Sequence, residues 1–183
     1  MAELGPVATP TAEIAARRSW TGPTLASGVL TEDIASFCQS GVGVAVASRD
    51  AAGWPVLARG RGCRIDADGR VRVFLRAGSA APLLEAVAAG GPVAATFSQP
   101  GSHRSIQLKA DRGTVRAAEP ADAPAAEAQS AVFRDLMIAA AYPEAFVDIY
   151  CGDGGQPVAV LEFMPARAFV QTPGPGAGGA LDA

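Results

Sequence analysis

The stretch Arg70-Val-Arg-Val-Phe-Leu-Arg76 alternates basic and apolar residues, and the turn Ala77-Gly-Ser79 follows it. A period of two is typical of a strand with one face in a core and the other face exposed. Ser79 is predicted to cap a short helix over residues 80–89, which ends at Gly90-Gly91. Pro92–Ser98 then has the composition of a further strand. A short helix inserted between two strands is the feature that decides the fold.

Further strands are predicted on both sides of this stretch. The residue ranges are 42–48, 55–65, 104–110, 114–118 and 158–163, the last continuing through 167–170. Helices are predicted from Thr31, a potential N-cap, to Gly41, and over the Ala-rich residues 122–141. About six to seven strands at intervals of roughly ten residues indicate a mainly β protein built as an antiparallel, closed or nearly closed barrel with flanking helices.

The ends of the chain differ in composition from its centre. Residues 1–27 carry scattered prolines and small residues, and residues 172–183 include a Pro-Gly repeat that denies regular structure. We therefore expect a flexible N-terminal arm over 1–27, a barrel domain over 28–171, and a flexible tail over 172–183.

Composition excludes several classes of function. The chain has 183 residues, 49% hydrophobic and 18% charged, and a formal net charge of −3. These values fit one globular domain and give no basic surplus for nucleic acid. No apolar run reaches the roughly 20 residues that span a bilayer. The first residues lack a secretory pattern, so a cytoplasmic location is expected.

The counts of histidine and cysteine limit the chemistry further. Cys38, Cys63 and Cys151 are widely spaced, and His103 is the single histidine. This set makes no structural zinc motif and no disulfide framework, so no metal and three free thiols are expected. Lys109 is the single lysine among 15 basic residues.

Three stretches give the chain a resemblance to a known family. They are Val71–Ser79 with the helix that follows it, Arg104-Ser-Ile-Gln-Leu-Lys-Ala110, and Phe169-Val-Gln-Thr-Pro-Gly-Pro-Gly-Ala-Gly178. In this order they resemble the pyridoxamine 5'-phosphate oxidase-like FMN-binding split barrels, and an uncharacterised branch of them, over roughly residues 31–178.

The resemblance implies a homodimer that binds FMN at the subunit interface and acts as an oxidoreductase on a small-molecule redox substrate that the sequence does not identify. FMN needs a cationic grip on its phosphate, and the planar fork of arginine suits phosphate oxygens. Candidates are Arg59 and Arg61, which share one face of a strand, and Arg76, with the hydroxyl of Ser79. Gln107 and Lys109 are expected along the edge of the isoalloxazine ring.

One departure from the family pattern leaves alternatives open. The classical oxidases have Arg-Lys directly after the serine, whereas this chain has Ala80-Ala81. Either the strand arginines or Lys109 replace that pair, or the barrel is a non-catalytic dimeric module that has lost flavin. A heme-binding split barrel is a further alternative, with His103 as the one available axial ligand.

Overall fold

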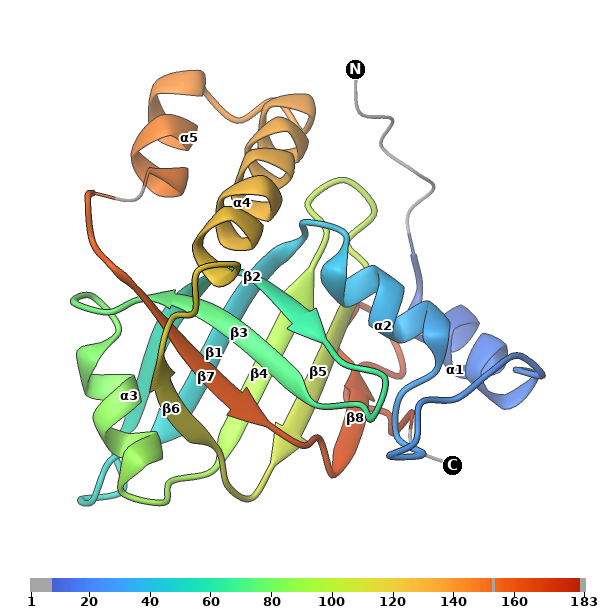
Figure 1. The fold of residues 1–183 in the computed structure, drawn as a ribbon. Helices are drawn as coiled ribbons and strands as arrows, with labels where there is room; N and C mark the ends of the chain where they lie inside the picture. Colours follow the sequence, from blue (N-terminus) through green and yellow to red (C-terminus); the bar gives the residue numbers. More distant parts are fainter. Residues whose placement is uncertain (1–7, 153, 182–183) are drawn as a thin grey trace.

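Figure 1 shows the computed structural model of the protein, which describes residues 8–152 and 154–181. Eight antiparallel strands form one sheet in the order β6-β7-β3-β2-β1-β4-β5-β8. The strands are β1 Gly43–Arg49, β2 Pro55–Ile65, β3 Val71–Arg76, β4 Val93–Ser98, β5 Ser105–Ala110, β6 Thr114–Ala117, β7 Val158–Phe163 and β8 Arg167–Val170. The mainly β, antiparallel fold predicted from the sequence is confirmed, with one strand more than the upper expectation.

Five helices flank the sheet within the described residues. They are α1 Pro10–Arg18, α2 Glu32–Gln39, α3 Ala81–Ala88, α4 Asp122–Ala139 and α5 Glu144–Cys151. Thr31 caps α2 as predicted, because its hydroxyl accepts a hydrogen bond from the backbone N–H of Ile34 at 3.2 Å. In Figure 1, α4 and α5 lie together over one end of the sheet, while α1 and α2 flank the opposite side. None of the helices in the described ranges has the length and apolar content that a membrane span requires.

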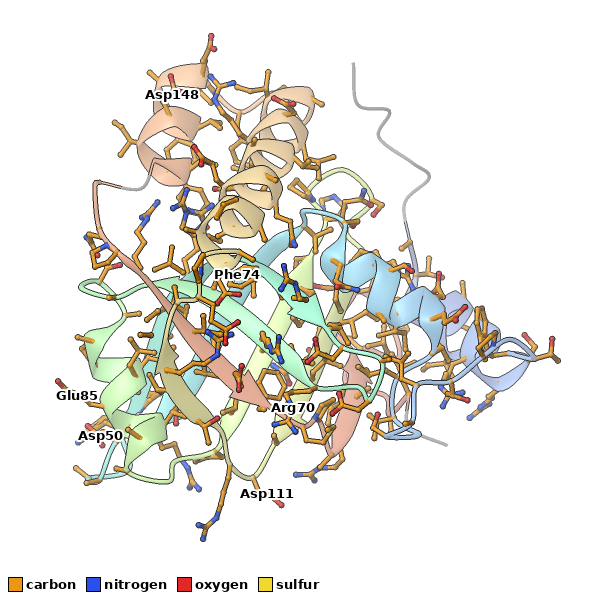
Figure 2. The ribbon with its side chains drawn as sticks, viewed as in Figure 1. Asp50, Arg70, Phe74, Glu85, Asp111 and Asp148 are labelled. Carbon is orange, nitrogen blue, oxygen red and sulfur yellow. The ribbon has the colours of Figure 1, made fainter. Side chains whose placement is uncertain are left out.

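The alternation in β3 determines which side chains enter the core. Val71, Val73 and Leu75 are fully buried in the main core cluster. Phe74 points to the outer face and is also fully buried, because it packs with Ala126 of α4 in a separate small cluster (Figure 2). The outer face of the sheet is therefore partly covered by α4 and partly open.

The last predicted strand is in fact two strands. β7 pairs with β3 and β6, whereas β8 pairs with β5 at the other edge of the sheet. Pro165 lies in the intervening segment, where proline cannot donate a ladder hydrogen bond. The expectation of a single strand continuing from residue 158 to residue 170 is therefore wrong.

The described parts of the two chain ends contact each other. The Arg17 side chain of α1 donates to the carbonyl of Leu181 at 2.6 Å. Arg104, at the start of β5, donates to Glu13 of α1 and lies 2.5 Å from a carboxylate oxygen of Asp33. Flexibility of residues 1–27 and 172–183 stays a prediction, and these contacts show what holds α1 against the barrel.

Candidate functional site

A row of side chains crosses the outer face of the sheet. Strand pairing places Gln107 of β5 opposite Thr96 of β4, Thr96 opposite Ala45 of β1, and Ala45 opposite Arg59 of β2. The pairing of β2 with β3 brings Arg76 beside Arg59 on the same face. Neighbouring strands lie about 4.8 Å apart, so this row runs from two arginines, over small residues, to an amide.

Arg59 is held between the sheet and the helical pair. Its guanidinium donates to the carbonyl of Tyr150 at the end of α5, and another nitrogen lies 3.7 Å from Cys151 Sγ. The guanidinium carbon is 4.2 Å from the ring centroid of Tyr150 and 5.3 Å from that of Phe133. Burial, together with the nearby charge of Arg76, lowers the pKa of Arg59. The group nevertheless stays charged at neutral pH, because the ordinary value for arginine is so high.

The neighbouring arginines have buried nitrogens without partners. Arg76 Nε and Nη2, Arg59 Nε and Arg61 Nε are all buried and donate to no acceptor among the described residues. Buried donors of this kind are costly unless a ligand satisfies them. Arg61 lines another pocket, of about 340 Å³, together with the acidic side chains of Glu127 and Asp148, whereas Arg76 has no carboxylate in an ion pair within the described chain. The pair Arg59–Arg76 is therefore the best anion-binding position on this face.

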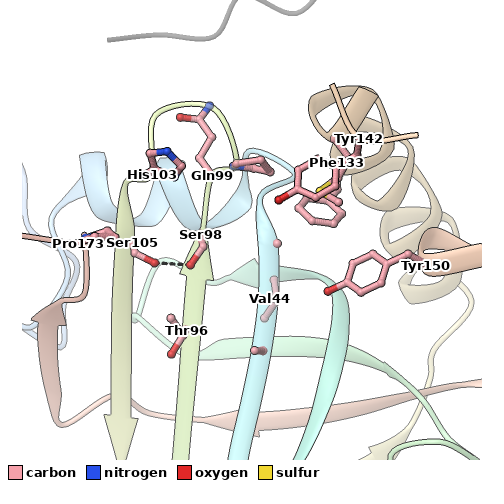
Figure 3. A pocket seen from close by; sticks show the side chains of 14 residues that line it. Val44, Thr96, Ser98, Gln99, His103, Ser105, Phe133, Tyr142, Tyr150 and Pro173 are labelled. Atoms are coloured by element: carbon pink, nitrogen blue, oxygen red, sulfur yellow. Dashed lines mark hydrogen bonds between the residues drawn. The ribbon is translucent and has the colours of Figure 1, made fainter. Parts of the chain in front are cut away.

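A cavity of about 350 Å³ lies over the open part of the sheet (Figure 3). Neither Arg59 nor Arg76 lines it, but Tyr150 and Phe133, whose rings contact the Arg59 guanidinium, do. Its floor includes Ala45 and Thr96, two members of the row. The walls are aromatic on the helical side and polar at the loop that joins β4 to β5. The remaining lining residues are Gly43, Val44, Ser98, Gln99, Pro100, His103, Ser105, Phe133, Met137, Tyr142, Tyr150 and Pro173. An apolar wall facing hydrogen-bonding groups suits a planar ligand with polar edges.

The loop at the rim of this cavity has a defined conformation. His103 has a φ of 59°, and its backbone N–H donates to the carbonyl of Gln99 at 3.0 Å. Ser98 and Ser105 share a hydrogen bond between their hydroxyls on the cavity floor (Figure 3). The single histidine of the chain therefore lies at the entrance, above a hydroxyl pair.

Ser79 does not cap α3, so the sequence expectation is wrong on this point. The N-cap is Ala80, without a side-chain hydrogen bond, and the helix begins at Ala81 with Pro82 in its first turn. The backbone N–H of Ser79 instead donates to Gln156 Oε1 at 2.9 Å. A phosphate role for the Ser79 hydroxyl stays a prediction.

The two β5 candidates lie in different surroundings. Gln107 donates to Thr96 Oγ1 at 3.0 Å and accepts from Gln171 at 3.4 Å, at the far end of the row. Lys109 lies one pleat further along β5, where it pairs with Arg167 of β8 and lines a different pocket. The structure thus places Arg59, Arg76 and Gln107 in one row and leaves Lys109 outside it.

Sequence reasoning missed the aromatic wall. Tyr142, Phe146 and Tyr150 are spaced four residues apart and stack with ring centroids 6.1 and 5.5 Å apart. Phe146 and Tyr150 come after Pro143 and Glu144, a proline and an acidic residue of the kind that begin a helix, so the pattern contained a signal for α5. In the described parts of the chain, no three His, Cys, Asp or Glu side chains form a group that could hold a metal ion.

Comparisons with solved structures agree with this architecture. HupZ of Group A Streptococcus matches with a TM-score of 0.51 and 15% identity, over 82% of this chain and 100% of that chain. A pyridoxamine 5'-phosphate oxidase-related, FMN-binding protein of Nostoc punctiforme matches at 10% identity, over 87% and 80%, with a TM-score of 0.42. An F420 reductase matches at 15% identity, over 76% and 98%, with a TM-score of 0.43.

The topology defines a class of fold. The strand order and the helix between β3 and β4 are those of a split barrel, and the likeness to HupZ, at 15% identity, supports the fold alone. The fold implied by the resemblance to pyridoxamine 5'-phosphate oxidase-like split barrels is confirmed. No protein-family model matches the chain, and no curated protein matches it in sequence.

Proposed function

We propose that this protein binds FMN and acts as an FMN-dependent oxidoreductase. The phosphate is held by Arg59 and Arg76, and the ring system lies over Ala45 and Thr96 toward Gln107. The observation that carries the proposal is the set of buried guanidinium nitrogens of Arg59 and Arg76 that donate to no group among the described residues. The cavity of about 350 Å³ beside them has the size of ligand pockets in general.

The residues present fit such a ligand at both ends. Two adjacent arginines offer several N–H donors to phosphate oxygens, and Arg76 keeps two buried nitrogens free of partners among the described residues. The middle of the row consists of Ala45 and Thr96, whose small side chains let a flat ring approach the sheet. Tyr150 and Phe133 close the side with aromatic faces. Bound FMN would supply hydride or electron transfer, while these residues position it and exclude water.

Arg59 and Arg76 replace the basic pair that is missing at Ala80-Ala81. The strand register supports this replacement, because Gly60 pairs with Leu75 next to the two arginines, and the charge of Arg76 is close enough to lower the pKa of Arg59. The alternative of a flavin-free module rests on Ala80-Ala81 alone. The spectrum of the purified protein separates these two functions.

A homodimer is part of the same proposal. The outer face carries small residues at Ala45 and Ala47, and Leu57 beside them is 74% exposed. Trp54, at the turn before β2, is 71% exposed. An open sheet face with exposed large apolar side chains is typical of a protein interface.

The test is a titration of FMN with the protein, in which binding is measured as quenching of flavin fluorescence. Arg59→Gln combined with Arg76→Gln is expected to weaken binding at least about tenfold, because each lost charged contact is worth roughly 1.5–3 kcal/mol. Arg112→Gln is the matched control, since this exposed arginine has the same charge and no contact with the cavity. Folding of each variant is checked by circular dichroism.

Two results would overturn the proposal. One is a colourless wild-type protein that does not quench FMN fluorescence at micromolar concentration. The other is equal affinity in the double variant and the control. A Soret band after addition of heme, without flavin binding, would indicate that the cavity binds heme instead. His103 would then be the residue to substitute.

A further inference from the structure

A second pocket lies on the outer face, at the other end of the strands that carry the row. Its volume is about 230 Å³, and its lining comes from the ends of β1, β4, β5 and β8. Arg49, Lys109 and Arg167 are the basic side chains that line it, and Asp111 is the acidic one. Figure 2 labels Asp111 at this lower edge of the molecule. The cavity described above shares none of these four residues.

Strand pairing brings the three basic residues together. Lys109 of β5 is directly paired with Arg167 of β8, and on its other side it is paired with Ala94 of β4. Ala94 pairs with Ala47 of β1, and Arg49 follows two residues later on the same face. The small side chains of Ala94 and Ala47 leave the space between the cations open.

These cations are not neutralised within the described chain. No ion pair is formed there by Arg49, Lys109 or Arg167, whereas Arg72, Arg104, Arg116 and Arg134 each have a carboxylate partner. Lys109 is held in place by a cation–π contact, with its Nζ 4.8 Å from the ring centroid of Phe169. Like charges directly opposite each other on antiparallel strands are destabilising. In a chain with a net charge of −3, such a pair that forms no ion pair within the described residues, even with Asp111 in the same pocket, indicates a site for an external anion.

We propose that this second pocket binds the phosphate group of a phosphorylated ligand distinct from the flavin. Two guanidinium forks and one ammonium match a doubly charged phosphate better than a single carboxylate, because arginine can donate in parallel to two phosphate oxygens. The pocket lies on the same face as the proposed flavin site, with Lys109 one pleat from Gln107. The inference goes beyond the proposed function and does not depend on it, since the two pockets use different residues.

The experiment measures binding of inorganic pyrophosphate by calorimetry at low salt. It is performed in an Arg59→Gln, Arg76→Gln background, so that any binding observed does not come from the first site. In that background, Lys109→Gln with Arg167→Gln is expected to reduce pyrophosphate affinity at least about tenfold. Arg70→Gln is the control, because this arginine lies on the β2–β3 hairpin, where its only ion pair is an exposed contact of 3.7 Å with Asp68.

A second readout separates binding from a structural role. Without anion, Lys109→Gln is expected to raise the melting temperature, because it removes the repulsion from Arg167. With saturating pyrophosphate, the protein that keeps Lys109 is expected to melt at the higher temperature, because only its pocket gains stability from the ligand. Asp111→Asn is expected to tighten binding.

Unchanged pyrophosphate affinity in Lys109→Gln with Arg167→Gln would overturn the proposal. The proposal would also be overturned if this double variant lost self-association in sedimentation and kept its anion affinity. The cations would then pair with carboxylates of a second copy. Failure of FMN binding leaves this result unaffected, so the two proposals fail separately.

Discussion

Asp122→Asn is the substitution whose effect follows most directly from the structure. Asp122 begins α4, and its side chain is completely buried. Oδ2 accepts from Arg116 Nη1 at 2.7 Å and from the backbone N–H of Glu119 at 2.8 Å. Arg116 in turn donates to Glu162 of β7 at 2.8 Å, so this network fixes the start of α4 against β6 and β7.

The magnitude follows from the type of contact that is lost. Hydrogen bonds to charged groups are worth about 1.5–3 kcal/mol each, and Arg116 keeps Glu162 as a partner in the variant. We therefore expect Asp122→Asn to lower the free energy of unfolding by about 2–3 kcal/mol. For a domain of this length that corresponds to a decrease of roughly 4–12 °C in melting temperature.

The dependence on pH gives a second check of the same network. Burial alone would raise the pKa of Asp122, but the hydrogen bond and charge of Arg116 outweigh it and lower the pKa below its ordinary value. The unfolded carboxyl titrates near pH 3.9, so this stabilisation is complete above about that pH. It is lost as the pH falls through the lower folded value. Asp122→Asn should abolish that part of the acid dependence.

The assay is urea unfolding, with Glu119→Gln as the matched control. The Glu119 side chain is 64% exposed and lies 3.8 Å from the same arginine, so its loss should cost less than about 0.5 kcal/mol. Equal stabilities of Asp122→Asn and Glu119→Gln would refute the conclusion that the buried carboxylate anchors α4.

Three other outcomes are expected. Arg104→Gln should expose α1 to limited proteolysis and destabilise the protein by about 1.5–3 kcal/mol, because this side chain binds carboxylates of both α1 and α2. Gly62→Ala should cost more than 1 kcal/mol in urea unfolding, since φ is 134° and a Cβ would lie 2.7 Å from Gln129. Burial raises the pKa of Cys38 and of Cys63, so the stability they contribute is complete below about pH 8.5 and is progressively lost above it. Substituting both with alanine should flatten that alkaline slope.

The sequence predicted the fold where one local signal coincided with one element. The alternation of Arg70–Arg76 corresponds to strand β3. Gly90 and Gly91 follow the end of α3, and Thr31 caps the start of α2. The split into β7 and β8 was missed because their partners are decided by contacts with strands far away in sequence. Local patterns carry no information on that choice.

The candidate site was predictable in its residue types and not in its arrangement. Period two placed Arg59 and Arg61 on one face, yet the β-bulge between Gly60 and Cys63 and the cover from α5 separate their surroundings. The proximity of Arg59 to Arg76 depends on strand register, which one sequence does not give. The sequence predicted Lys109 beside the flavin together with Gln107. In the structure β8 pairs Lys109 with Arg167, whereas it pairs Gln107 with Phe169.

The position of β7 has a consequence for how the chain folds. β7 lies between β3 and the edge strand β6, so neither of these neighbours can pair with it until a strand is synthesised that begins more than 40 residues after β6 begins. Until Val158–Phe163 arrives, β3 keeps an unpaired edge and Phe74 lacks Val160, one of its two cluster partners. Nascent chains at this stage are candidates for edge-to-edge aggregation and chaperone capture. Folding should therefore be slow for a domain of this size and should finish from the C-terminal end.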